Sequence, residues 1–447
     1  MVQYKRYERY KDSGVEWLGE VPENWSVDRL KSSVKSLKNG VWGDDPKGNE
    51  NDVFCVRVAD FNRNKYEVET EEFTVRNLGR EKQKAFILKK GDLLIEKSGG
   101  GDNQPVGFVV RYNREEPAIY ANFMARMHLN EKISCSNFFK YVHSSIYANR
   151  INVRSIKQTT GIQNLDTDYY LQEIVVYPTL QEQIKISEFL DQKTAEIDSL
   201  ITDKEKLIAL SEKQRQAIIT ETVTKGLDLD VKMKDSGVEW IGKIPEHWEI
   251  CEFRRISTLQ QGLQIAQEER FSEGGPGRFE YITIKYLNSL RTELDKEFIE
   301  NPNKRVICYP EEILLARTGA TGVVVTNIFG VFHNNFFKVN FNKSRIGRDY
   351  LVYYLKQVKI QEHFKLVAGT TTIPDLNHGE FLSTKCLIPP VSEQIQIVDF
   401  LDSCISDIDS LITEIKNQIN KLKEYRQSLI YEAVTGKINV RDVAAGY

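Results

Sequence analysis

Apolar residues recur at alternating spacings of four and three along residues 401–429, which is the period of one face of a long helix. They fall at Leu401, Ile405, Ile408, Ile412, Ile415, Ile419, Leu422 and Leu429, with Arg426 as the break. An earlier segment keeps the same seam, with polar breaks at Thr194, Lys204, Ser211 and Arg215, and its apolar members are Leu190, Ile197, Ile201, Ile208 and Ile218. This is the a and d pattern of a coiled coil. The pattern therefore predicts two long helices that pack against each other.

Shorter apolar runs with polar breaks precede each long helix and predict strands. In the first half of the chain they lie at 54–61, 85–88, 91–99 and 106–112, and in the second half at 279–287, 311–319, 322–328 and 336–341. One further helix is expected in each half, at 137–151 and at 348–364, followed by a short strand that ends at Pro178 or Pro389. Each half therefore combines strands with helices.

Several stretches of the sequence occur twice. KDSGVEWLGEVPENW at 11–25 returns as KDSGVEWIGKIPEHW at 234–248, with eleven of fifteen positions identical. TTGIQNLD at 159–166 is similar to TTTIPDLN at 370–377. The helical segments that follow share the motifs Glu-Gln-Ile, Phe-Leu-Asp and Ile-Asp-Ser-Leu-Ile. Two long copies are too few for a solenoid. They predict an α+β protein with two similar mixed α/β lobes, joined by two long helices that form a coiled coil.

The repeats and seams also predict the domain boundaries. We expect a first lobe with its repeated opening motif at 1–180, a first spacer helix at 181–226, a second lobe at 227–390, a second spacer helix at 391–437 and a tail at 438–447. Between the repeated motifs, the lobes at 26–178 and 249–390 have very different sequences. The repeated motifs are alike and the lobes between them differ, which favours a protein whose two lobes recognise two different targets.

The net charge of −3 does not by itself indicate a nucleic-acid binder. The distribution is more informative, because the lobe at 26–178 carries 23 Lys and Arg against 20 Asp and Glu, and the lobe at 249–390 carries 18 against 16. Small basic patches are compatible with DNA binding by a chain that is acidic overall. The longest apolar stretches fall well short of a membrane span, and the N-terminal residues lack the apolar run of a signal peptide. We therefore expect a cytoplasmic protein without a membrane partner.

The chain lacks the common signatures of catalysis. It has no GxxxxGK[ST] loop for ATP, no GxGxxG turn for a dinucleotide or methyl donor, and no Asn-Pro-Pro-aromatic motif of amino-methyltransferases. Its six cysteines and six histidines are scattered without a zinc-like spacing. The sequence predicts no catalytic residues, no metal site and no cofactor in this chain.

The candidate DNA contacts are basic and hydroxyl residues beside flexible backbone, which suit contacts to phosphates or base edges. At the ends of two aligned strands they are Lys97, Ser98 and Gly99 in the first lobe and Arg317, Thr318 and Gly319 in the second. Around the TTxI loops they are Arg150, Arg154, Lys157, Thr159 and Thr160, and Lys359, Lys365, Thr370, Thr371 and Thr372. The alternative for each is a turn or a helix face that is simply solvated.

Together, the repeated opening motif, the TTxI loop and the helix that begins Glu-Gln-Ile and continues Phe-Leu-Asp resemble the specificity subunit of type I restriction–modification systems. The resemblance covers about residues 11–436 and both copies of each motif. It implies two target-recognition domains that each read one half of a split, asymmetric site in double-stranded DNA. It also implies that the two long helices form an antiparallel coiled coil, which acts as a spacer. The partners it implies are two methyltransferase subunits and the motor–nuclease restriction subunits. S-adenosylmethionine, ATP and Mg²⁺ would then belong to those partners.

Two other classes of function stay open at this point. A coiled-coil scaffold could bind protein partners only, without contacting DNA. An enzyme could assemble its site from residues that no motif marks. Salt-sensitive DNA binding by the reconstituted complex, and the activity of the purified chain alone, distinguish these alternatives.

Overall fold

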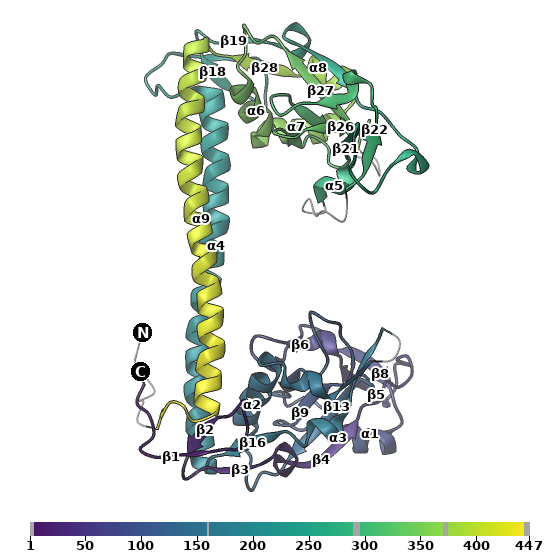
Figure 1. Ribbon diagram of the computed structural model, residues 1–447, viewed down its shortest axis with the longest axis vertical. Coiled ribbons are helices and arrows are strands. Elements are labelled where there is room, and N and C mark those ends of the chain that lie inside the picture. The colour runs from purple at the N-terminus through teal and green to yellow at the C-terminus, as the bar shows by residue number, and fades with distance from the viewer. Residues whose placement is uncertain (1–3, 159–160, 289–295, 370–373, 442–447) are drawn as a thin grey trace. The chain divides into compact units, whose positions relative to one another are not determined.

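Two long helices occur where the apolar seams predict them. Helix α4 runs from Leu180 to Lys225 and α9 from Val391 to Val434 (Figure 1). All seam residues of both helices are buried or half-buried. The computed structural model describes residues 4–158, 161–288, 296–369 and 374–441.

The chain divides into two units, and the boundary falls inside both long helices. The first unit comprises residues 1–205 and 416–447, and the second comprises residues 206–415. Each unit thus contains one lobe together with a piece of α4 and a piece of α9. The two pieces are connected by direct contacts within each unit.

In the first unit, a polar break of each seam contacts a polar residue of the other long helix. Arg426 of α9 forms an ion pair with Asp198 of α4, and Lys204 Nζ donates a hydrogen bond to Gln418 Oε1. The partner in α9 moves toward its N-terminus as the α4 position moves toward its C-terminus, so these pieces run antiparallel. In the second unit, Arg215 of α4 pairs with Asp409 of α9.

The described strands of the first unit form two main sheets and three small ones. The larger main sheet has the order β4 (Val34–Asn39), β13 (Met124–Leu129), β9 (Leu93–Glu96), β11 (Val109–Arg111), β7 (Glu67–Val68), β6 (Phe61–Asn62). The other has the order β12 (Ala118–Tyr120), β5 (Asp52–Val56), β8 (Thr74–Asn77). The small sheets are β1 (Tyr10–Asp12) with β2 (Glu20–Pro22), β16 (Ile174–Tyr177) with β3 (Ser26–Arg29), and β10 (Ser98–Gly99) with β15 (Gln163–Leu165) and β14 (Ile156–Gln158).

The second unit repeats much of this pairing order with different side chains. Its sheets are β20 (Ser257–Gln261), β27 (Phe336–Phe341), β24 (Leu314–Ala316), β25 (Val324–Val325), and β22 (Phe298–Glu300), β21 (Arg278–Ile282), β26 (Gly330–Phe332), β23 (Ile307–Cys308). Two pairs complete it, β19 (Glu249–Glu252) with β28 (Lys385–Ile388) and β17 (Met233–Asp235) with β18 (Lys243–Pro245). In both units a strand pairs in parallel with one neighbour and antiparallel with the other, as β5 does with β12 and β8 and β21 does with β26 and β22.

Short helices cover the sheets of both units. They are α1 (Arg80–Phe86), α2 (Ser136–Ala148) and α3 (Thr167–Tyr170) in the first unit, and α5 (Ile284–Asn288), α6 (Arg348–Lys356), α7 (Val358–Val367) and α8 (His378–Ser383) in the second. The predicted strand at 85–88 is wrong, because α1 ends there after a run of strong helix formers, Arg80–Phe86. The predicted helix at 348–364 is two helices. The chain leaves the helical conformation at Gln357, where ψ is 148°, and α7 then buries Ile360 and Phe364 in the core.

The repeated opening motif forms the same packed turn in each unit. Trp25 and Trp248 are both fully buried. Gly226, just after α4, lies against Trp248, and Gly436, just after α9, lies against Trp25 and Pro22. Both glycines have positive φ, and a Cβ atom at Gly436 would overlap Pro22, so glycine is required there. The motif thereby fixes the end of a long helix to the start of a lobe.

Two further observations concern the chain as a whole. All six cysteines carry free thiols. Among the described residues, none of the helices is both long and apolar enough to traverse a bilayer.

Candidate nucleic-acid interface

In the first unit, the Lys97 turn is bonded directly to the residues that follow the TTxI motif. Lys97 follows strand β9, its backbone N–H donates to Phe123 O at 2.7 Å, and Leu165 N donates to Lys97 O at 2.8 Å. Ser98 and Gly99 form β10, which pairs antiparallel with Asn164 and Gln163 of β15. Gly99 has a φ of +117°, a conformation that favours glycine. The Lys97 turn and residues 163–165, which lie far apart in the sequence, are therefore one structural feature.

The second unit builds the same junction from different residues. Arg317 N donates to Asn335 O at 2.7 Å, and Leu376 N donates to Arg317 O at 3.0 Å. Thr318 forms a bridge with Asp375, just as Ser98 pairs with Asn164. The equivalent backbone bonds place Lys97 and Arg317 at equivalent positions of their lobes. Each lobe thus presents one basic residue, one hydroxyl and a glycine at this junction.

The two basic side chains differ in what they contact. Lys97 Nζ donates to Asn39 Oδ1 at 2.8 Å, a neutral partner. Arg317 forms a bidentate ion pair with Asp375, with Nε–Oδ1 at 2.8 Å and Nη2–Oδ2 at 2.6 Å. These hydrogen bonds raise the pKa of Arg317 and lower the pKa of Asp375. The pair uses the Nε–Nη2 edge of the guanidinium, and the Nη1–Nη2 edge is the one that could contact guanine in a bidentate manner while Asp375 holds the side chain.

The other predicted contacts of the first unit lie close to this junction. Arg150 adopts a left-handed conformation with φ of 55°, and its Nη2 donates to Asp102 O at 3.3 Å, so it reaches the glycine-rich loop after Lys97. Arg154 is exposed in the short helical turn Ile151–Ser155. Lys157 is exposed on β14 and pairs with Asp166 at 2.6 Å. The predicted contacts Thr159 and Thr160 lie outside the described residues.

In the second unit, Lys359 and Lys365 are exposed on α7. This helix contacts the Arg317 turn, because Gln361 Nε2 donates to Gly322 O at 2.7 Å. Thr321 Oγ1 in turn donates to Pro374 O at 3.0 Å. The predicted contacts Thr370, Thr371 and Thr372 lie outside the described residues.

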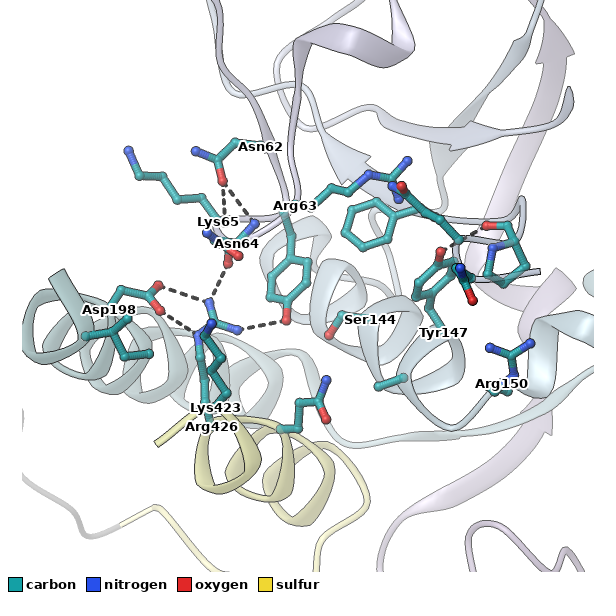
Figure 2. Close-up of a pocket in the computed structure, with 18 of the residues that line it drawn as sticks. Asn62, Arg63, Asn64, Lys65, Ser144, Tyr147, Arg150, Asp198, Lys423 and Arg426 are labelled. Carbon is teal, nitrogen blue, oxygen red and sulfur yellow. Dashed lines mark hydrogen bonds and ion pairs between the residues drawn. The ribbon is translucent and has the colours of Figure 1, made fainter. Parts of the chain in front are cut away.

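A cavity of about 770 Å³ lies beside the junction in the first unit, between the turn at 62–66, α2 and the pieces of α4 and α9 (Figure 2). Arg63 and Arg150 line it. Arg63 stacks over the Phe108 ring at 4.4 Å and pairs with Glu96 at 2.8 Å, one residue before Lys97. Burial raises the pKa of Glu96, against the opposing effect of Arg63. The positive charge of Arg63 is thus largely compensated inside the protein.

Two pairs of residues that are not among the predicted DNA contacts connect the lobes to the long helices. Gln183 is fully buried, its Oε1 accepts from Cys135 N at 2.8 Å, and its Nε2 donates to Ile133 O and Pro178 O at 2.9 and 3.0 Å. Gln394 makes the same three contacts, to Gly347 N, Arg345 O and Pro389 O. These glutamines are the middle residues of the repeated Glu-Gln-Ile motif. The repeat was the signal that could have identified them.

The aspartates of the repeated Phe-Leu-Asp motif form a second joint. Tyr141 of α2 donates to Asp191 of α4 at 2.7 Å, and Tyr353 of α6 donates to Asp402 of α9. Each lobe helix is therefore fixed to a long helix through a tyrosine hydroxyl. Elsewhere in the described part of the chain, the histidines, cysteines and acidic residues form no group that could hold a metal ion.

Comparison with known proteins identifies the class. A family model described as the type I restriction modification DNA specificity domain matches residues 22–209 and again residues 245–421. These two matches cover most of the chain, once per unit. The chain therefore belongs to the specificity subunits of type I restriction–modification systems, which confer DNA sequence specificity and are non-catalytic.

Individual relatives agree over nearly the full length. The MjaVIII specificity subunit of Methanocaldococcus jannaschii is 22% identical, over 99% of both chains. The EcoKI specificity subunit of Escherichia coli K12 is also 22% identical, over 95% of this chain and 91% of its own. A solved chain from work on complex assembly and conformational transition of the type I R-M system has a TM-score of 0.66, at 14% identity. It covers 93% of this chain and 98% of its own, and it shares the fold.

Proposed function

We propose that each lobe reads one half of a bipartite, asymmetric site in double-stranded DNA, through the junction of the strand-end turn and the TTxI loop. The observation that carries this proposal is the repeated junction with unlike chemistry. The backbone bonds around Lys97 and Arg317 are equivalent, but Lys97 contacts a neutral amide and Arg317 a carboxylate. Two lobes that recognise different half-sites need equivalent backbone positions that present different side chains.

We propose further that α4 and α9 form an antiparallel coiled coil that sets the spacing between the half-sites. The antiparallel contacts within the first unit and the buried seam residues support this geometry. The seam from residue 401 to residue 429 would span roughly 42 Å at about 1.5 Å per residue. This length corresponds to about twelve base pairs of DNA. In this arrangement the lobes at 1–180 and 227–390, the spacer helices at 181–226 and 391–437 and the tail at 438–447 are the functional segments.

We propose that the chain acts by positioning its partner subunits on the DNA site. The repeated frame, with its glutamine and aspartate joints, offers two similar surfaces for two methyltransferase subunits. Those subunits, together with the motor–nuclease subunits, would supply S-adenosylmethionine, ATP and Mg²⁺. The methyltransferases would be held over one adenine in each half-site and would flip that base themselves. Because its substrate would be cellular DNA, we place the complex in the cytoplasm.

The test is coexpression of this chain with its neighbouring methyltransferase subunit, followed by mapping of methylated adenines across the host genome. We expect a single motif of two short half-sites around a fixed gap. If both proteins are soluble and associated but no methylation occurs, the alternative of a scaffold that binds only proteins gains support. Methylation of one continuous short site would refute the two-reader proposal.

A further inference from the structure

The two arginines that interrupt the apolar seams are equivalent residues of the internal repeat. Arg215 and Arg426 each precede a glutamine, and both lie the same distance after the repeated Ile-Asp-Ser-Leu-Ile motif. The aspartates of that motif, Asp198 and Asp409, are equivalent as well. An arginine at an a or d position weakens the apolar contact of a coiled coil, so its presence in both copies calls for a structural reason.

Each arginine pairs with the aspartate of the other copy. In the first unit, Arg426 Nε lies 2.9 Å from Asp198 Oδ1, and Nη2 lies 3.1 Å from Oδ2. In the second unit, Arg215 Nη1 lies 2.7 Å from Asp409 Oδ1. The same ion pair therefore occurs twice: α9 supplies the arginine in the first unit, and α4 supplies it in the second. Both pairs join α4 to α9 at equivalent positions of the two helices.

Their surroundings are not alike. The side chain of Arg426 is only 9% exposed. It donates from Nη1 to Tyr66 Oη at 2.8 Å and from Nη2 to Asn64 O, and its guanidinium lies 5.2 Å from the Tyr66 ring centre (Figure 2). The side chain of Arg215 is 30% exposed. Within the described residues its hydrogen bond goes to Asp409 alone. In the part of the chain that the structure describes, only Arg426 of this pair also forms hydrogen bonds to a lobe.

The turn that Arg426 holds leads directly to the candidate interface. Tyr66 has a left-handed backbone with φ of 56°, and its carbonyl accepts a hydrogen bond from Arg111 N at 2.9 Å. Arg111 belongs to β11, and β11 pairs with β9, the strand that ends at the Lys97 turn. Hydrogen bonds thus connect α9, through the turn at Tyr66 and strand β11, to strand β9, and the chain continues from β9 into Lys97.

We propose that Arg426 is a positioning residue that fixes the DNA-reading junction of the first lobe on helix α9, whereas Arg215 serves only the helix pair. This inference rests on the proposed function, that the first lobe reads one half-site. Three nitrogens of the planar guanidinium contact Asp198, Tyr66 and Asn64 at once, and a lysine ammonium cannot reproduce that fork. Loosening this contact should let the first junction shift along the DNA without changing which bases it reads.

Three variants separate lobe positioning from helix pairing. Tyr66→Phe removes the hydroxyl that Arg426 contacts and leaves the ion pair with Asp198 in place. Arg426→Lys removes the fork. Arg215→Lys is the matched control, because it changes the equivalent ion pair and, within the described residues, Arg215 forms no hydrogen bond to a lobe. Each variant is purified as the complex with the methyltransferase subunit, and assembly is checked by size and thermal melting.

The measurement is binding to DNA duplexes that carry the native site, the native half-sites with one base pair more or fewer between them, or a mismatch in either half-site. For Tyr66→Phe and Arg426→Lys, we expect the preference for the native gap to fall about tenfold, as expected for loss of a hydrogen bond to a charged group. We expect Arg215→Lys to keep that preference within about twofold. Preference for the half-site bases should stay at the wild-type level in all three variants.

The outcomes are distinguishable from a failure of the proposed function. If the wild-type complex shows no preference for a bipartite site, the proposed function itself is wrong. If the wild type does, but Tyr66→Phe and Arg426→Lys discriminate gaps as Arg215→Lys does, Arg426 is not a positioning residue. Because Tyr66→Phe retains the ring and the ion pair, it still decides the question if Arg426→Lys fails to assemble.

Discussion

At the scale of single residues, the buried glutamines Gln183 and Gln394 show how the repeat fixes each lobe to its helix. A glutamine amide can donate and accept at the same time, and each of these side chains joins a lobe segment, the strand-end proline and the start of a long helix. Among the contacts described, this one is reproduced most closely in both units. It explains why the Glu-Gln-Ile motif occurs twice while the lobe sequences differ.

Replacing Gln183 by alanine should destabilise the first unit by roughly 2–4 kcal/mol, because three buried hydrogen bonds are lost and their backbone partners stay buried. The measurement is the free energy of unfolding in denaturant. Gln181→Ala, an exposed position two residues earlier on the same helix, is the control and should change stability by less than about 0.5 kcal/mol. Equal effects of the two substitutions would contradict the joint that we assign to Gln183.

His143 gives the first unit a defined pH dependence. It is fully buried on α2, its Nδ1 lies 2.7 Å from Tyr170 Oη, and burial lowers its pKa to about 3. In the unfolded chain the imidazole binds a proton below about pH 6.5, and in the folded unit it does not until the pH approaches 3. The unfolded state therefore gains protons first, and stability is lost as the pH falls below 6.5.

From this group alone, the free energy of unfolding at pH 5.5 should be about 1.4 kcal/mol lower than at pH 7.5. His143→Phe should remove that part of the slope, whatever its effect on stability at pH 7.5. Tyr170→Phe breaks the same hydrogen bond but keeps the imidazole, so it should retain the slope. The test compares unfolding curves of the three proteins across this pH range. An unchanged slope in His143→Phe would refute the assignment.

At the scale of elements, the long helices and many strands followed from the sequence because their patterns are local. The seam from Leu401 to Leu429 predicts α9, and the run at 336–341 is strand β27 in full. What the sequence did not predict depends on partners far away in the chain. The pairing of Ser98 with Asn164 and the capture of Arg317 by Asp375 are set by tertiary contacts, which no local period encodes. Arg426, a break in the apolar pattern, is explained only by its contacts with Asp198 and Tyr66.

The length of the helix pair should set the gap between the two DNA half-sites. Inserting four residues in α4 and four at the matched place in α9 should lengthen the gap between half-sites and leave the half-site bases unchanged. Four residues shift the phase of an apolar seam, whereas seven residues preserve it. A matched seven-residue insertion should therefore lengthen the gap further and lower the melting temperature less than the four-residue insertion does. Methylation mapping and melting curves check both expectations. An unchanged gap in both variants would argue against a ruler.

At the scale of the whole chain, two units built on one frame should be separable in function. The frame is concentrated in the opening motif, the glutamine and aspartate joints and the helix pair, and the lobe at 26–178 lies between frame residues. We expect the lobe to recognise one half-site and the repeated segments to assemble with the partner subunits. Replacing residues 26–178 by the lobe of another family member should therefore change one half-site only. The gap and the second half-site should remain, because α4, α9 and the lobe at 249–390 are untouched.

The donor lobe needs an equivalent of Tyr141 to contact Asp191, and a backbone turn that reaches Arg426. Mapping methylated adenines in cells that express the exchanged protein tests this directly. A change in both half-sites would show that the lobes do not read independently. A change in the gap alone would mean that the lobe positions the complex and other residues read the bases.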